Sequence, residues 1–255
     1  MRRSLILNVV LVLFTVACGG NQRAVTQPEA PATGNQFLLD YPNLADPDGE
    51  VLIDNEFVVV QRFIVGPGEW EGIHSHPGNQ VFVHVKGGLW SGITGGGEPT
   101  SSGTPREDGA VGWMAPIPLS EGHESGNTGD APIDLIWVTL KKDAPVGIGK
   151  QFLLDYPNLA DPDGEVLLEN DRVVVQRFIV GPGEWEGIHS HPGNQVYIHI
   201  KGGIWSGRTG GVQRDGTNFS EPGSVGWMRA IPLSEGHESG NTGDTPIDLI
   251  WVTLK

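Results

Sequence analysis

The stretch Gly68–Gly87 constrains the fold most, and it occurs a second time, nearly unchanged, at Gly183–Gly202. The first copy reads GEWEGIHSHPGNQVFVHVKG, and it places His74 and His76 one residue apart. Side chains alternate between the two faces of a β-strand, so both imidazoles lie on one face if this stretch is extended. Two imidazoles on one strand face are what a metal site inside a barrel requires. The sequence therefore predicts two barrels, each built around one copy.

The repeat extends well beyond this stretch. Residues 36–90 align with residues 151–205 with eight differences, and residues 112–140 align with residues 226–254 with three. The segment between these two blocks has diverged, as surface loops usually do. In the second copy it has gained Arg208 and Arg214, which could select an anionic ligand in that barrel alone.

Each copy has the length of an ordinary domain. We predict one domain over residues 36–144 and a second over residues 151–255, with a linker at residues 145–150. Because this linker is short, we expect the two barrels of one chain to pair closely. Whether they also form a homo-oligomer with other chains is left open.

Short β-branched runs between turns indicate an all-β fold. The chain has 38 glycines and 19 prolines, and long apolar stretches with helical periodicity are absent. Many short strands separated by Gly and Pro turns are typical of a sandwich or a barrel. In the first copy the expected strands are residues 57–65, 73–76, 80–85, 89–93, 111–114 and 133–140.

The start of the chain resembles a targeting segment. Arg2 and Arg3 precede an apolar run at residues 5–16, which is shorter than the about 20 residues of a membrane-spanning helix. Residues 15–18 resemble a lipobox, so residues 1–18 are predicted to be a signal peptide that leaves Cys18 lipidated. Residues 19–35 would be a flexible linker, and the protein a lipoprotein of the bacterial cell envelope, in the periplasm or at the outer membrane. A plain secretory signal is the alternative.

The net charge excludes one class of partner. The chain carries a formal charge of −15, whereas nucleic-acid binding requires a basic surface. Cys18 is the only cysteine, so the folded part has neither a disulfide nor a thiolate metal site. Any contact with a membrane is expected only through the lipid on Cys18. The expected partner is a small-molecule ligand or substrate.

Two spaced motifs resemble a known family. The pattern Gly68-x5-His74-x-His76-x3-Gln80-x6-Gly87 is similar to the first cupin motif, with Gln80 where that family usually has Glu. The pattern Gly112-x5-Pro118-x-Ser120-x2-His123-x3-Asn127 is similar to the second cupin motif, with Ser120 where Gly is usual. Both patterns recur in the second copy. The chain thus resembles a bicupin, and the resemblance implies two tandem double-stranded β-helical barrels of the jelly-roll type.

The resemblance also implies one divalent transition metal in each barrel. Carried over by motif position, the expected ligands are His74, His76, Gln80 and His123 in the first barrel, and His189, His191, Gln195 and His237 in the second. Gln is a neutral and weaker ligand than a carboxylate, and the alternative is that it does not bind the metal at all. Imidazole-rich sites favour Fe, which we expect, with Cu, Ni, Zn or Mn as alternatives.

The expected activity is that of a metal-dependent dioxygenase or lyase that acts on a small anionic or chelating substrate. The alternative is a non-catalytic protein of the cell envelope that binds a small molecule or a metal. His84 and His199 are candidates for proton transfer or substrate contact, and the alternative for both is a buried neutral histidine. Glu69, Glu71 and Glu124 flank the motif histidines, and each could be an acid or base, although most such acids are simply solvated.

Overall fold

The computed structural model describes residues 49–101, 103–141, 164–191, 193–216 and 218–255. The predicted signal peptide with Cys18, the linker at residues 19–35 and the linker at residues 145–150 lie outside these residues. Apart from two short 3-10 helices, every regular element in the described ranges is a strand, which confirms the all-β expectation. Within those ranges, no helix is long and apolar enough to cross a membrane.

The first barrel is made of two sheets. Its elements are β1 (Glu50–Asp54), β2 (Val58–Val65), β3 (Gln80–Lys86), β4 (Trp90–Thr94), β5 (Thr100–Ser101), β6 (Val111–Met114), the 3-10 helix η1 (Leu119–Glu121), β7 (His123–Asn127) and β8 (Ile133–Leu140). A five-stranded sheet has the order β1-β2-β8-β3-β6, and a three-stranded sheet has the order β5-β4-β7. All of the paired strands are antiparallel.

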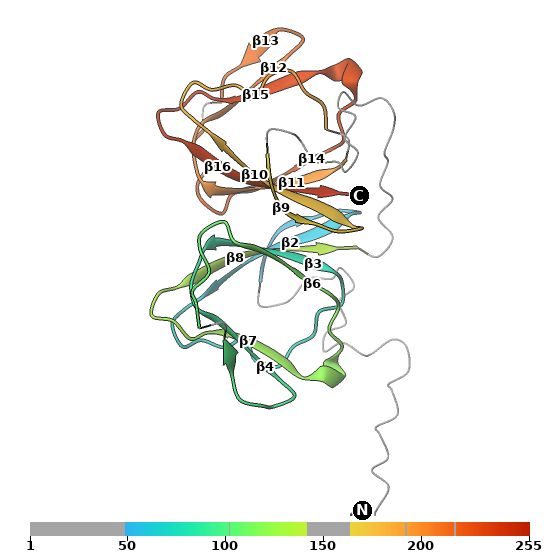
Figure 1. The fold of residues 1–255 in the computed structure, drawn as a ribbon. Coiled ribbons are helices and arrows are strands. Elements are labelled where there is room, and N and C mark those ends of the chain that lie inside the picture. Colours follow the sequence, from blue (N-terminus) through green and yellow to red (C-terminus); the bar gives the residue numbers. More distant parts are fainter. Residues whose placement is uncertain (1–48, 102, 142–163, 192, 217) are drawn as a thin grey trace, which may run out of the picture.

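The second barrel repeats this arrangement. Its elements are β9 (Glu165–Glu169), β10 (Val173–Val180), β11 (Gln195–Lys201), β12 (Trp205–Thr209), β13 (Val212–Arg214), β14 (Val225–Met228), the 3-10 helix η2 (Leu233–Glu235), β15 (His237–Asn241) and β16 (Ile247–Leu254). The sheet orders are β14-β11-β16-β10-β9 and β13-β12-β15. Figure 1 shows the two barrels stacked with their five-stranded sheets facing each other and their three-stranded sheets on the far sides.

Most predicted strands are present, and two parts of the pattern differ. The predicted strands within 57–65, 80–85, 89–93, 111–114 and 133–140 correspond to β2, β3, β4, β6 and β8. Residues 73–76 do not form a ladder strand; they make two isolated bridges, from His74 to His123 and from His76 to Ile117. Strand β7 was not expected, because its sequence HESGN is polar and has none of the β-branched residues that mark strands.

Alternation along β3 separates two cores. Phe82 lies inside the first barrel with Trp137 and Ile133, and Gln80 and His84 share its face of the strand. Val81, Val83 and Val85 point the other way, toward the second barrel. The same strand therefore contributes polar and aromatic residues to the barrel interior and aliphatic residues to its outer face. The second barrel has an equivalent interior around Ile247, Leu249 and Trp251.

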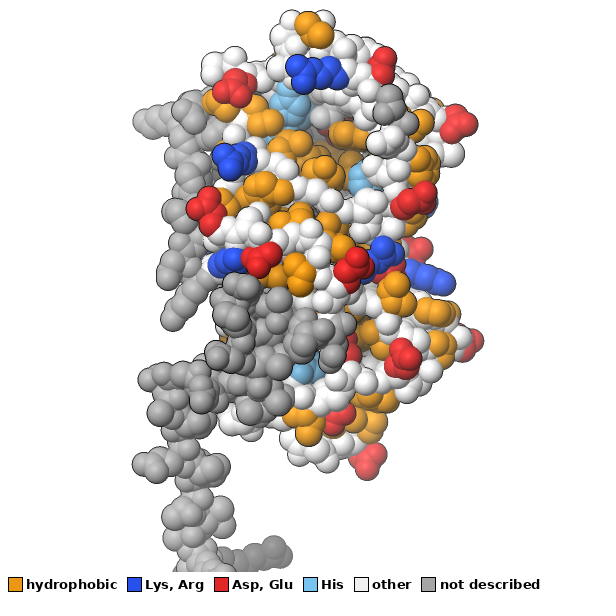
Figure 2. Space-filling view, turned by 180° about the vertical axis from the view of Figure 1, so that it is seen from behind, with side chains coloured by type: hydrophobic (Ala, Val, Ile, Leu, Met, Phe, Trp, Pro, Cys, Tyr) orange, Lys and Arg blue, Asp and Glu red, His pale blue; other side chains and the backbone are white. Residues whose placement is uncertain are grey.

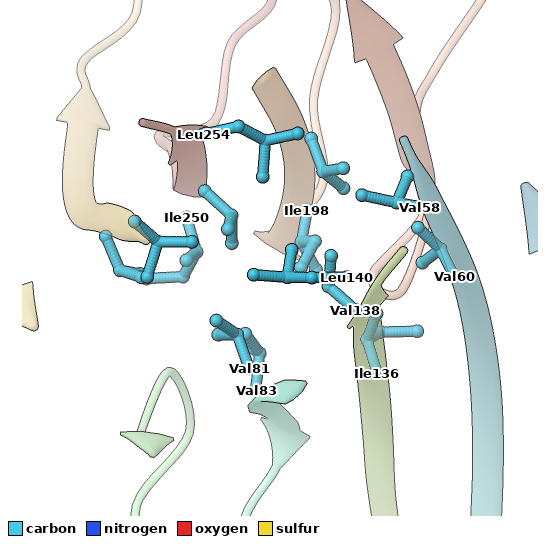
Figure 3. Packing of buried hydrophobic residues seen from close by; sticks show 14 of the residues in the cluster. Val58, Val60, Val81, Val83, Ile136, Val138, Leu140, Ile198, Ile250 and Leu254 are labelled. Atoms are coloured by element: carbon cyan, nitrogen blue, oxygen red, sulfur yellow. The ribbon is translucent and has the colours of Figure 1, made fainter. Parts of the chain in front are cut away.

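The outer faces of the two large sheets form one continuous aliphatic cluster. It joins Val58, Val60, Val81, Val83, Ile136, Val138 and Leu140 of the first barrel to Ile198, Ile250, Leu254 and other aliphatic residues of the second (Figure 3). We call this set the inter-barrel core. Each fully buried aliphatic side chain of this size contributes about 1.5–3 kcal/mol relative to exposure. The expectation that the barrels pair within one chain agrees with this packing.

Gly112, at the start of the second motif, is required by close packing. It lies opposite Phe82 in the β3–β6 pair, and a Cβ at Gly112 would overlap the Phe82 ring. The phenyl ring therefore covers the backbone of β6 at this point, inside the barrel.

Candidate metal centre

The two halves of the site come from distant parts of the chain. The His74 amide donates to the His123 carbonyl at 2.8 Å, and the His76 amide donates to the Ile117 carbonyl at 2.9 Å. These bonds hold the segment that follows β2 against the start of β7 and against the residues just before η1. One ring nitrogen each of His74, His76 and His123 then lies within 4.8 Å of the others, and His189, His191 and His237 form the same cluster in the second barrel. We call these groups the histidine triads.

Backbone and amide carbonyls fix the orientation of two rings in each triad. The Nδ1 atom of His74 lies 2.9 Å from the Gly72 carbonyl, and the Nδ1 atom of His76 contacts the Gln80 Oε1 atom. Because a carbonyl oxygen only accepts, each Nδ1 atom carries the hydrogen and donates it. In the neutral rings the Nε2 atoms are therefore left with bare lone pairs. His189 and His191 make the equivalent contacts with Gly187 and Gln195.

These lone pairs point at each other. The Nε2 atoms of His74 and His76 are 3.0 Å apart, and those of His189 and His191 are 3.2 Å apart. With the hydrogens on Nδ1, neither Nε2 atom has a proton to share. Two ligand atoms each about 2.1 Å from one ion would lie about 3.0 to 3.4 Å apart for angles between about 90° and 110°. The donor set and its spacing therefore fit one metal cation.

Burial lowers the pKa of two histidines in each triad. It is the largest cause that lowers the pKa of His76 to about 3, with the charge of His74 acting in the same direction. Burial likewise lowers the pKa of His191 to about 3 and the pKa values of His123 and His237 to about 4. At neutral pH these imidazoles have no charge, which is the form that binds a metal.

The third histidine is set differently in the two barrels. The Nε2 atom of His123 lies 3.0 Å from the Ser125 hydroxyl, whereas the Nε2 atom of His237 lies 3.1 Å from the Nε2 atom of His191. The His237 Nδ1 atom is buried and has no hydrogen-bond partner among the described residues. In the second barrel all three Nε2 atoms thus converge, and in the first barrel one of them turns to a hydroxyl.

Gln80 lies behind His76 and not among the converging nitrogens. Its Oε1 atom accepts from the Nδ1 atom of His76, and its Nε2 atom donates to the Thr139 hydroxyl at 2.8 Å. Gln195 is held in the same way by His191 and Thr253. This geometry favours the alternative in which the glutamine orients a ligand ring and does not bind the metal itself.

Thr139 was not foreseen as part of the site. The signal was present in the alternation of β8, where Ile133, Leu135 and Trp137 point into the barrel and Thr139 is the next inward position. A buried hydroxyl at an otherwise apolar inward position needs a polar partner, and the partner here is Gln80. The threonine therefore belongs to the shell of residues that fixes the site.

His84 is not part of the triad. Its side chain is buried, and the Nδ1 atom has no hydrogen-bond partner among the described residues; His199 is the same in the second barrel. Burial is the main cause that lowers the pKa of His84 to about 4, followed by the charge of Arg106. The structure therefore favours the buried neutral histidine over a group that transfers protons at neutral pH.

The three flanking acids differ in their surroundings. Glu69 accepts from the Gly66 amide at 2.6 Å in the turn before the motif. Glu124 lies on β7 opposite Ile93, and its counterpart Glu238 pairs with Arg208 at 3.2 Å. Glu71 is different, because its carboxylate lies 3.8 Å from the Nε2 atom of His74.

Arg208 is also engaged. Besides pairing with Glu238, its guanidinium lies 3.5 Å from the centre of the Trp185 ring, and its Nε atom donates to the Gln213 side chain. This arrangement ties Arg208 to the outer strands of the second barrel. It therefore gives no support to the expectation that Arg208 selects an anion.

Two pairs of equivalent tryptophans lie in different cores. Trp137 and Trp251 are buried inside the barrels, and they pack against His76 and His191 at ring-centre distances of 5.3 and 5.4 Å. Trp113 packs on the inter-barrel core, and Trp227 stacks on Phe57 of the first barrel at 5.5 Å. The last two therefore line the contact between barrels and not a ligand pocket.

A pocket opens beside the second triad. It has a volume of about 430 Å³ and is lined by His237, Met228 and Ile231 among others. That volume is in the range of small-molecule sites. A larger pocket of about 630 Å³, beside Lys86 and Arg106, contains no triad residue. On the face drawn in Figure 2, histidine is visible among apolar side chains, and charged residues are scattered.

Comparison with solved structures agrees with this architecture. No protein-family model and no curated protein matches the sequence. The chain is similar to AerE from Microcystis aeruginosa, with a TM-score of 0.55 and 12% identity over 82% of this chain and 94% of that one. It is also similar to a single-residue mutant of oxalate decarboxylase from Bacillus subtilis, with a TM-score of 0.51 and 14% identity over 78% and 69% of the two chains. These likenesses show the fold, which is that of two tandem cupin barrels.

Proposed function

We propose that this tandem cupin binds one divalent transition-metal ion in each barrel and is a dioxygenase or lyase for a small anionic or chelating substrate. The observation that carries the proposal is the convergence of two Nε2 atoms in each triad, 3.0 and 3.2 Å apart, while the Nδ1 atoms of the same rings face carbonyl oxygens. With the hydrogens on Nδ1, both Nε2 lone pairs are available to one cation. When bound, such an ion supplies a Lewis-acidic or redox-active centre.

The residues around each triad have separate tasks. The triad holds the ion, and Gln80 keeps the His76 ring in the tautomer that leaves its Nε2 atom free. Trp137 packs against His76 and shields it from water on the barrel side. Because three neutral imidazoles leave the charge of a divalent ion uncompensated, the site favours an anionic ligand. The pocket beside His237 gives such a ligand a way in.

The donor set also limits the metal. Imidazole suits Fe, Cu, Ni and Zn, whereas Mg and Ca prefer oxygen ligands. We propose Fe for this chain. Mn remains an alternative, because oxalate decarboxylase from Bacillus subtilis, which shares the fold, has Mn(II) centres.

Metal analysis of the purified protein tests the proposal. We expect about two ions per chain, and about one ion per chain after either His76→Ala or His191→Ala. His84→Asn is the matched control outside the triad and should retain both ions. A folded wild-type chain that takes up no Fe, Mn, Co or Zn would refute the proposal.

Oxygen uptake and substrate screens then separate the enzyme from the alternative, a metal-loaded binding protein of the cell envelope. Turnover that falls with metal content supports the enzyme. Ligand binding without turnover supports the binding protein. Equal loss of turnover in His76→Ala and His191→Ala would count against a division of labour between the barrels.

For localisation, we propose that Cys18 is lipidated and tethers the chain to the bacterial cell envelope. The support is the sequence alone: Arg2 and Arg3, the apolar run at residues 5–16, and the lipobox-like residues before Cys18. Labelling with a fatty-acid analogue should mark the wild type and not Cys18→Ser. An unlabelled wild-type chain released into the medium would favour the plain secretory signal.

A further inference from the structure

Each triad has a carboxylate within 4 Å of one of its ring nitrogens. The Glu71 Oε2 atom lies 3.8 Å from the Nε2 atom of His74, and the Glu186 Oε2 atom lies 3.9 Å from the Nε2 atom of His189. The two side chains are 17% and 18% exposed, so most of each is shielded from water. The contacted nitrogen is the one that carries the free lone pair. The same contact is therefore present twice, at the edge of each triad.

A glycine explains why Glu71 points toward the triad. Glu71 and His74 are three residues apart, and on a regular strand such residues lie on opposite faces. Between them Gly72 has a φ of +75°, a conformation that side chains disfavour, and Gly187 has a φ of +79°. This kink, together with the bond from the Glu71 amide to the Ser125 carbonyl at 2.9 Å, aims both side chains at the same point.

Charge balance gives this carboxylate a role. Gln80 is neutral and stands where the motif usually has Glu. An imidazole that gives a nitrogen lone pair to a metal ion also carries no charge. A divalent ion held only by these groups keeps its full charge in a largely buried site, which is costly unless an anion is near. Glu71 is the anion that the fold places next to a ligand atom.

We propose that Glu71 and Glu186 are the carboxylate ligands of the two metal sites. This inference rests on the proposed function, because it needs the triads to bind a metal. The acid absent from position 80 is then supplied from nine residues earlier in the chain. Gln80 is left to orient His76, and each ion has three imidazoles and one carboxylate.

The test compares E71Q/E186Q with the control E69Q/E184Q in the full chain. Glu69 lies two residues from Glu71, and its oxygen accepts from a backbone amide, which a glutamine oxygen also does. The probe is Co(II), whose affinity is measured by chelator competition and whose ligand set is read from its visible absorption spectrum. Far-UV circular dichroism and the Tm of the metal-free proteins show whether each variant is folded.

We expect E71Q/E186Q to bind Co(II) at least about tenfold more weakly, with a shifted absorption spectrum, and the control to remain within about twofold of the wild type. An unchanged affinity would overturn the inference. A weaker affinity with the wild-type spectrum would also overturn it, because the carboxylate would then act from outside the coordination sphere. A wild-type chain that binds no Co(II), Fe(II) or Zn(II) would instead refute the proposed function.

Discussion

Ile136→Ala tests whether the inter-barrel core makes the two barrels one cooperative unit. Ile136 is fully buried on β8 and belongs to the cluster shared by both barrels. The substitution removes three carbons, which costs about 2.4 kcal/mol at about 0.8 kcal/mol for each buried CH₂. The residual void adds to this, because β-sheets on both sides limit collapse, so we expect a total loss of about 3–4 kcal/mol.

Urea unfolding is the assay, followed by far-UV circular dichroism and by tryptophan fluorescence. Trp113 and Trp227 lie against the inter-barrel core and report on it directly. Ile64→Ala is the matched control, because Ile64 is 65% exposed on a neighbouring strand and should change stability by less than about 0.5 kcal/mol. Ile250→Ala, at the equivalent place in the second barrel, should cost the same as Ile136→Ala.

The decisive observation is the shape of the unfolding curve. If the cluster is shared, Ile136→Ala shifts one transition that both probes report. Two transitions in Ile136→Ala, with the second at the midpoint of the wild type, would refute the reasoning. The barrels would then be independent domains that happen to touch.

Three further predictions concern the barrel interior. Thr139→Val leaves the buried Gln80 amide without its acceptor, so it should cost about 1–3 kcal/mol in urea unfolding, while Thr139→Ser should restore most of the loss. Gly112→Ala forces a Cβ into the Phe82 ring and should destabilise by about 1–3 kcal/mol; adding Phe82→Leu should recover part of this, and no recovery would contradict the packing. The metal-free protein should lose stability as the pH falls from about 6.5 toward 4, because six buried or half-buried histidines, His84 among them, have pKa values of about 3 or 4 when folded and about 6.5 when unfolded, so the unfolded chain takes up these protons first. His84→Asn should reduce the slope between pH 7 and 5 by the share of one of these six histidines, up to about 1.4 kcal/mol per pH unit, and an unchanged slope would contradict the lowered pKa of His84.

The repeat and the β-branched runs were sufficient to predict the architecture. In runs such as residues 133–140 both strand faces are buried, one inside the barrel and one between the barrels. Their sequences are therefore almost continuously apolar, which predicts a buried strand. Strand β7 could not be predicted in this way, because its identity as a strand depends on backbone pairing with β4 and not on side-chain pattern. Nor could sequence alone tell that Trp113 faces the partner barrel.

At the site, residue type was predictable but side-chain direction was not. Spacing placed His74 and His76 on one side, and the structure brings both to His123. The position of Gln80 in the motif suggested a ligand, whereas its contacts with His76 and Thr139 favour the alternative in which it orients the ring. The nearness of Glu71 depends on one backbone angle at Gly72, which strand periodicity does not encode.

The inter-barrel core also bears on how the two copies can evolve. Equivalent strands meet across it, which is the geometry of a symmetric homodimer carried within one chain. In a homodimer every substitution occurs on both sides of the interface, and assembly depends on concentration. In this fused pair the association is intramolecular, and each copy can change alone. Phe57 stacks on Trp227, but its counterpart is Arg172, and Ile93 has Arg208 as its counterpart. One barrel can therefore acquire a new specificity while its neighbour retains the old one.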